Sequence, residues 1–97
     1  MGAQQYIGTG RLGTTQNVGY TGSSGAITNP LGSETYKVRV LVTTDAFVKI
    51  GDGSPTATTS DAYLPALSPE YFTCTPGQKV AAVQVSSGGT LYVTEVS

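Results

Sequence analysis

Apolar and polar positions alternate most clearly between Gln78 and Val96. Successive side chains of a β-strand point to opposite faces, so alternation with a period of two is typical of strands. The runs at 79–85 and 90–96 flank the sequence Ser86-Ser87-Gly88-Gly89, in which glycine supplies the conformations that a tight reversal needs. We therefore predict a β-hairpin here. Neither run carries a charge in its middle, which favours a sandwich or a subunit contact that covers both faces.

A second pair of alternating runs lies earlier in the chain. Residues 36–43 place tyrosine and three valines on one face and lysine and arginine on the other, the pattern of a half-buried strand. Thr44 and Asp45 form a turn, since an aspartate side chain can hydrogen-bond the backbone two residues on. The alternation resumes over 46–50. We predict that these two runs form an antiparallel pair.

The stretch between the two pairs is rich in turn-forming residues. Residues 51–62 form a loop, in which a bound calcium ion is not expected because the carboxylates lack the regular spacing of a calcium loop. A short extended piece follows between Pro65 and Pro69. Proline has no N–H to donate to a sheet, so this piece belongs at a sheet edge or in a covering loop.

One more strand is predicted over 70–75, with Tyr71 and Thr73 on one face and Phe72 and Cys74 on the other. The order Pro76-Gly77 then indicates a type II turn. The chain thus shows five or six strands and no helical periodicity. This predicts an all-β fold, either a small antiparallel β-sandwich or a jelly-roll-like barrel, with an extended glycine-rich N-terminal arm.

The arm is predicted over residues 1–33, and the β-sandwich domain over residues 34–97. Eight of the first 33 residues are glycine and Arg11 is the sole charged one, so the arm has too few large apolar groups to offset the entropy cost of ordering. We expect it to order against a partner subunit or neighbouring protein, the alternative being a disordered tail, and we expect the domain to fold without it. The predicted partner-binding anchors are Tyr6, Ile7, Leu12, Val18, Tyr20 and Ile27.

Composition narrows the possible partners. Charged residues make up 11% of the 97-residue chain and the net charge is −1, which gives no electrostatic footprint for nucleic acid or an anionic membrane. No apolar run approaches membrane-spanning length. We therefore expect neither nucleic acid nor membrane as a partner, and a surface so poor in charge favours contact with protein.

The chain offers few groups for catalysis. Cys74 is the only cysteine and the chain has no histidine, so a disulfide within the chain is impossible and the thiol lacks its commonest activating base. We interpret Cys74 as a small buried apolar residue. We expect no enzyme activity, no catalytic or metal-binding residues and no cofactor.

Six short motifs from residue 43 onward carry a resemblance to known proteins. They are TTDAFVKI (43–50), SPTAT (54–58), YLPA (63–66), PEYF (69–72), PGQKV (76–80) and QVSSGGTLYVTE (84–95). With these, the chain from Val38 onward resembles a family of small proteins encoded among the virion-structure genes of tailed bacteriophages. Residues 1–33 have no part in the resemblance.

The resemblance implies a capsid cement or decoration protein. Such a protein is made in the host cytoplasm, oligomerises as a dimer or trimer, and bridges subunits of the major coat protein on the outer surface of the phage capsid. Two alternatives remain open: a head-to-tail connector, tail or fibre component, or a carbohydrate- or host-surface-binding β-module. The last is disfavoured by the lack of tryptophan and by tyrosines that fall in or beside predicted strands.

Overall fold

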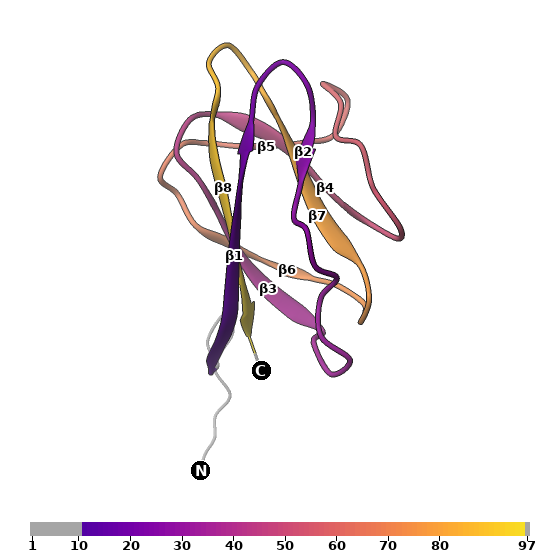
Figure 1. The fold of residues 1–97 in the computed structure, drawn as a ribbon. Coiled ribbons are helices and arrows are strands. Elements are labelled where there is room, and N and C mark those ends of the chain that lie inside the picture. Colours follow the sequence, from indigo (N-terminus) through magenta and orange to yellow (C-terminus); the bar gives the residue numbers. More distant parts are fainter. Residues whose placement is uncertain (1–10, 97) are drawn as a thin grey trace.

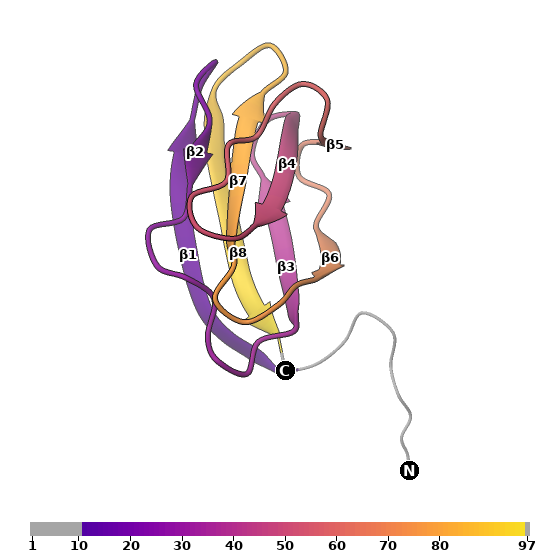
Figure 2. The same ribbon diagram turned by 90° about the vertical axis from the view of Figure 1, so that its right-hand side faces the viewer.

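Two four-stranded antiparallel sheets pack face to face in the computed structural model, which describes residues 11–96 (Figures 1 and 2). No helix occurs among these residues, and the predicted all-β sandwich is confirmed. The strands are β1 (Leu12–Tyr20), β2 (Gly25–Ala26), β3 (Lys37–Val42), β4 (Ala46–Gly51), β5 (Ala62–Leu64), β6 (Glu70–Thr73), β7 (Lys79–Gln84) and β8 (Gly89–Val96).

Most consecutive strands along the chain lie in opposite sheets. One sheet, called here the β1 sheet, has the order β1-β8-β3-β6, and the other, the β2 sheet, has the order β2-β7-β4-β5. Figure 2 looks onto the β2 sheet, with β1 and β2 along one side of the sandwich and β5 and β6 along the other. Among the described strands, β4 and β5 are the only consecutive ones that pair with each other.

Both predicted strand pairs are therefore wrong as pairs, although their strands exist. β7 and β8 lie in different sheets, and so do β3 and β4. The turn residues bond to neighbouring strands instead, since Val85 N–H donates to Asp45 C=O at 3.2 Å and Thr43 N–H donates to Thr90 C=O at 3.1 Å. Alternation reveals a strand but not its partner, and a short loop can cross the roughly 10 Å between packed sheets as readily as it can close a hairpin.

The core lies between the sheets and is dominated by valine. Branched side chains suit a pleated surface, and their burial away from water supplies most of the driving force for folding. Each strand of the central pairs contributes every second residue to this layer. The fully buried large side chains are Ile27, Val38, Val40, Val42, Leu64, Val80, Leu91 and Val93.

The predicted boundary between an arm and a domain at residue 33 is corrected by the structure. β1 pairs with β8 and β2 pairs with β7, and Tyr20, Ile27 and Leu31 are buried in the shared core. Ile27 and Leu31 are also tied to the segment 78–80 by backbone hydrogen bonds. A glycine-rich segment that cannot fold alone is thus completed by pairing with strands from the other end of the chain. Residues 1–10 lie outside the described residues.

Of two smaller predictions, the type II turn is confirmed and the extended piece between two prolines is corrected. Gly77 has a φ of +86° and Gln78 N–H donates to Thr75 C=O at 3.2 Å, the geometry of a type II turn with proline at its second position. The piece between Pro65 and Pro69 connects the edge strands β5 and β6, in agreement with the prediction of a loop, but it contains a turn at residues 66–67 and is not extended.

Candidate functional site

The outer face of the β2 sheet is covered by the protein's own loop. Ala57, from the loop between β4 and β5, packs on Ala81 and Val83 in a small apolar cluster outside the main core. Its N–H donates to the Ser24 hydroxyl at 2.9 Å, which fixes the loop beside β2. The part of this face over β7 is therefore occupied by contacts within the chain, whereas Tyr63 on β5, beside Phe47, is 52% exposed.

The outer face of the β1 sheet is different. Tyr92 pairs across the sheet with Leu41, and Tyr71 pairs with Arg39. The two tyrosines are 37% and 41% exposed, and neither hydrophobic cluster of the described residues includes a side chain from this group. Tyrosine and arginine are the residues most enriched at the energetic centres of protein interfaces. We call Arg39, Leu41, Tyr71 and Tyr92 the tyrosine face.

Threonine and asparagine extend the tyrosine face toward β1. Asn17 lies beside Tyr92 and Thr15 beside Thr94, with the two threonine hydroxyls 3.0 Å apart in a hydrogen bond. The charged side chains on this face are Lys37 and Arg39, both basic. The face is thus nearly free of carboxylates and rich in groups that can both donate and accept hydrogen bonds.

The structure places the predicted partner-binding anchors in different environments. Tyr6 and Ile7 lie outside the described residues, Leu12 is 63% exposed at the start of β1, and Val18 is half-buried against the core. Tyr20 and Ile27 are core residues, 2% and 1% exposed, so the expectation that they bind a partner is corrected. They anchor their own sandwich.

Tyr20 illustrates this internal role. Its hydroxyl donates to the Thr44 carbonyl at 2.6 Å and accepts from the Thr44 N–H at 3.2 Å. This arrangement, the Tyr20 clasp, ties the end of β1 to the connection between β3 and β4. A buried phenol with its hydroxyl satisfied in this way stabilises the junction of the two sheets.

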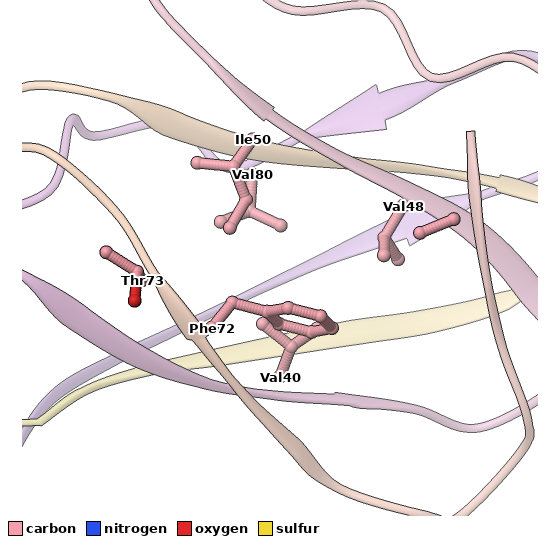
Figure 3. A pocket seen from close by; sticks show the side chains of 7 residues that line it. Val40, Val48, Ile50, Phe72, Thr73 and Val80 are labelled. Atoms are coloured by element: carbon pink, nitrogen blue, oxygen red, sulfur yellow. The ribbon is translucent and has the colours of Figure 1, made fainter.

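A second feature is an apolar cavity of about 250 Å³ between the sheets, on the side where β5 and β6 end them (Figure 3). Val40, Val48 and Val80 come from the core, whereas Phe72 and Ile50 are half-buried. In Figure 3 the Phe72 ring lies over Val40, opposite Ile50 and Val80. The residues that line the cavity are Val40, Val48, Ile50, Ala62, Phe72, Thr73 and Val80.

Sequence reasoning did not identify the tyrosine face or the cavity. The sequence correctly predicted that Tyr71 and Phe72 lie on opposite faces of β6. This was the one indication in the sequence that Tyr71 could be exposed. However, to predict the tyrosine face one must also know the strand order, which places β6 and β8 on either side of β3. To predict the cavity one must know how the two sheets pack.

Ionisable groups near these features serve the fold. The Tyr63 hydroxyl donates to Asp45 at 2.7 Å and the Ala66 N–H donates to the same carboxylate at 2.8 Å, and these bonds lower the pKa of Asp45 below its ordinary value. The same contact raises the pKa of Tyr63. Together they fasten β5 to the connection between β3 and β4.

Cys74 is buried, as predicted. Burial raises the pKa of its thiol, and the nearby Glu95 carboxylate adds to the rise. A thiol whose pKa is raised is a poor nucleophile at neutral pH.

The carboxylate of Asp61 accepts from the N–H of Thr58 at 2.7 Å within its own turn. Residues 11–96 contain no cluster of three metal-binding side chains. Nor do they contain a helix long and apolar enough to cross a membrane.

Comparisons with protein-family models, with curated proteins and with solved structures find no match for this chain.

Proposed function

We propose that this protein is a non-enzymatic structural component of a phage virion, a capsid cement protein that binds the major coat protein through the tyrosine face. It acts on the outer surface of the capsid as a homo-oligomer and bridges neighbouring coat subunits. The proposal rests on the resemblance of residues 38–97 to virion proteins and on one structural contrast. The outer face of the β2 sheet is covered in part by its own loop, whereas the outer face of the β1 sheet brings Tyr71, Tyr92 and Arg39 together.

The chemistry of the tyrosine face suits a lasting protein contact. Tyrosine buries a large apolar area with few rotatable bonds, and its hydroxyl keeps a hydrogen-bonding end at the rim. Arg39, half-buried between Thr94 and Tyr71 in the sheet, can donate to carboxylates or carbonyls of the partner. A nearly uncharged face also avoids the cost of desolvating many ions.

The mechanism is mechanical and thermodynamic. A protein that binds the assembled shell but not its separated subunits stabilises the shell by mass action. Repeated copies on a symmetric surface add avidity, so each contact can be modest. No catalytic group is needed for this role.

The first test is the copy number of this protein in purified particles, measured by mass spectrometry against the major coat protein. One copy per coat subunit, or a fixed simple fraction of that, is expected of a shell-wide cement. A ratio far below this moves the protein to a connector, tail or fibre, and absence from particles refutes a virion role.

The second test locates the contact. Tyr92→Ala combined with Arg39→Ala should weaken binding to shells that lack the protein by at least about tenfold, the loss typical of interface hot spots. Lys49→Ala is the matched control, because Lys49 is an exposed basic residue on the outer face of the other sheet. Equal binding by the two variants would place the contact elsewhere.

The exposed tyrosines also support a second candidate, a carbohydrate-binding role. Tyr71 and Tyr92 stand on one face with β3 between their strands, about two strand spacings or roughly 10 Å apart across the sheet. Sugar rings can stack on such aromatic side chains. Binding of the isolated protein to a glycan array, lost in Tyr92→Ala, would favour this role over capsid binding.

A further inference from the structure

Leu67 has a backbone conformation that leucine rarely adopts. It lies in the turn at residues 66–67, in the connection between β5 and β6, and its φ is +60°. A bulky residue in this region is strained, and glycine is the residue that usually supplies such a conformation. Among residues 11–96, Leu67 is the one residue other than glycine with a positive φ. The turn itself would therefore favour glycine at this position.

The Leu67 side chain does not serve the core either. It is 70% exposed, the most exposed large apolar side chain of the described residues. The turn is nevertheless held on both sides, because Leu67 N–H donates to the Val42 carbonyl and Ala66 N–H donates to the Asp45 carboxylate, each at 2.8 Å. Strained residues that the surrounding structure holds in place cluster at functional positions. Leu67 is thus a firmly presented apolar group, which indicates contact with another molecule.

The apolar cavity opens on the same side of the sandwich. β5 and β6 are the edge strands of the two sheets on this side, and their connection runs between them (Figure 2). Ala62 on β5 and Thr73 on β6 line the cavity and are both exposed, so its mouth lies between these strands. Leu67 and the mouth of the cavity therefore share one surface, formed by residues 62–73, which we call the β5–β6 side.

The cavity suits a leucine side chain in size and chemistry. Its volume is about 250 Å³, and Thr73 is its one polar lining residue. An apolar cavity of about 150 Å³ already accommodates a benzene ring and stays free of water, and a leucine side chain is no larger than that ring. Entry of a leucine would remove both its own surface and the cavity wall from water.

A second copy of this chain carries the matching group. A two-fold interface is self-complementary, because each contact between one residue and another occurs twice. Segment 62–73 contains Glu70 as its single charged residue, so two copies of this side can meet with little desolvation of ions. Tyr63, 52% exposed on β5, adds a residue type that is enriched at protein interfaces.

We propose that the β5–β6 side is the interface of a two-fold homodimer, in which Leu67 of each copy enters the apolar cavity of the other. This contact would supply the self-association of the proposed homo-oligomer. It does not rest on the virion role, because the purified protein alone should form it.

Sedimentation equilibrium of the purified protein over a range of concentrations tests the dimer. Leu67→Gly should raise the dissociation constant of the dimer at least about tenfold, without lowering the thermal stability of the monomer, because glycine relieves the strained φ. Leu12→Ala is the matched control, since Leu12 is a 63% exposed leucine on β1, at the opposite side of the sandwich. It should leave the dissociation constant unchanged.

Three results would overturn the proposal. The first is a parent protein that stays monomeric from micromolar to millimolar concentration, and the second is equal association by the Leu67→Gly and Leu12→Ala variants. The third is a complex that keeps growing with concentration, because a two-fold contact closes at two copies. A monomer whose Leu67→Gly variant no longer binds capsid shells would assign the β5–β6 side to the coat protein, and the proposed function would then stand without the dimer.

A cross-link locates the contact. Leu67→Cys and Ala62→Cys are prepared as separate proteins, each in a Cys74→Ala background, then mixed and mildly oxidised. A mixed disulfide between the two proteins is expected and is identified by mass spectrometry, whereas Leu12→Cys mixed with Ala62→Cys should form none. Absence of the mixed Leu67–Ala62 product from the folded proteins would contradict entry of Leu67 into the cavity.

Discussion

Tyr20 holds the upper end of the sandwich through its hydroxyl. The clasp joins β1 of one sheet to the connection that leads into β4 of the other, and the Tyr20 ring is 2% exposed. Removing a hydroxyl leaves the Thr44 N–H and C=O without these partners in a part-buried site. The cost of such orphaned groups usually exceeds the net value of the bond itself.

We therefore expect Tyr20→Phe to lower the free energy of unfolding by about 1–2 kcal/mol. Urea denaturation followed by tyrosine fluorescence or circular dichroism measures it. Tyr92→Phe is the control, because its ring lies 37% exposed on the tyrosine face, and a change below about 0.5 kcal/mol is expected there. Equal losses in the two variants would mean that the clasp contributes nothing.

Asp45 gives the protein a pH-dependent contact. Its pKa is lowered first by the Tyr63 hydroxyl and then by the Ala66 N–H, so the folded state prefers the ionised carboxylate. The stability from this contact is fully present above the ordinary pKa of aspartate, about 3.9, and is lost as the pH falls through the lowered pKa. In Asp45→Asn the acid-induced loss of stability should therefore be smaller than in the parent, measured by thermal unfolding between about pH 2 and pH 6. If Asp45→Asn loses as much stability at acid pH as the parent protein, Asp45 does not contribute to that loss.

At the scale of elements, β2 lies close against β1 at Gly25. A Cβ at this position would overlap the carbonyl oxygen of Gly19, and Gly19 is held in β1 by the pairing with β8. Because the obstacle is backbone and not a flexible side chain, β2 would have to move away from β1, which would strain its pairing with β7.

Gly25→Ala should destabilise the protein by about 1–3 kcal/mol, the usual cost of overpacking. Gly22→Ala is the matched control from the same connection, since a Cβ there meets nothing closer than the Gln84 amide nitrogen at 3.9 Å. Chemical denaturation of both variants compares the two sites. Similar stability of the two would show that β2 can shift without loss.

Alternation in the sequence identified the strands with two distinct faces but not their partners. The segments that became β3, β4, β6, β7 and β8 were all predicted as strands, because one face of each is apolar. β1 was not predicted as a strand because polar residues occupy both of its faces in the middle. Gln16 points toward the other sheet and satisfies its amide with the backbone of Asn29, at 2.9 and 3.0 Å, an arrangement that no local pattern reveals.

The two strand pairs were predicted wrongly because a local sequence pattern does not identify a strand's partner. A glycine-containing turn at 86–89 has the composition of a hairpin turn whether it joins two strands in one sheet or crosses between sheets. The exposure of Tyr71 could be predicted from the alternation in β6, but its position near Tyr92 depends on β3 lying between β6 and β8. Strand order is a property of the whole chain.

On the scale of the whole molecule, residues 11–33 are structural. Deleting residues 1–33 removes β1, β2 and the core side chains Tyr20, Ile27 and Leu31, so we now expect an unfolded chain, in contrast to the sequence-based expectation. Deleting residues 1–10 leaves every described strand in place and should preserve a cooperative thermal transition. Circular dichroism of the two truncated proteins distinguishes these results, and a folded 34–97 fragment would contradict the role assigned to β1 and β2.

The pairing of β1 with β8 also governs when the protein can fold during its synthesis. A ribosome adds about 5–20 residues per second, so β1 waits several seconds before its partner strand exists. β2 waits for β7 in the same way, and the valine-rich β3 gains its second neighbour only when β8 appears. Folds dominated by such long-range pairings form slowly, in about milliseconds to seconds. Neither sheet can therefore be completed until β8 and β7 have been synthesised.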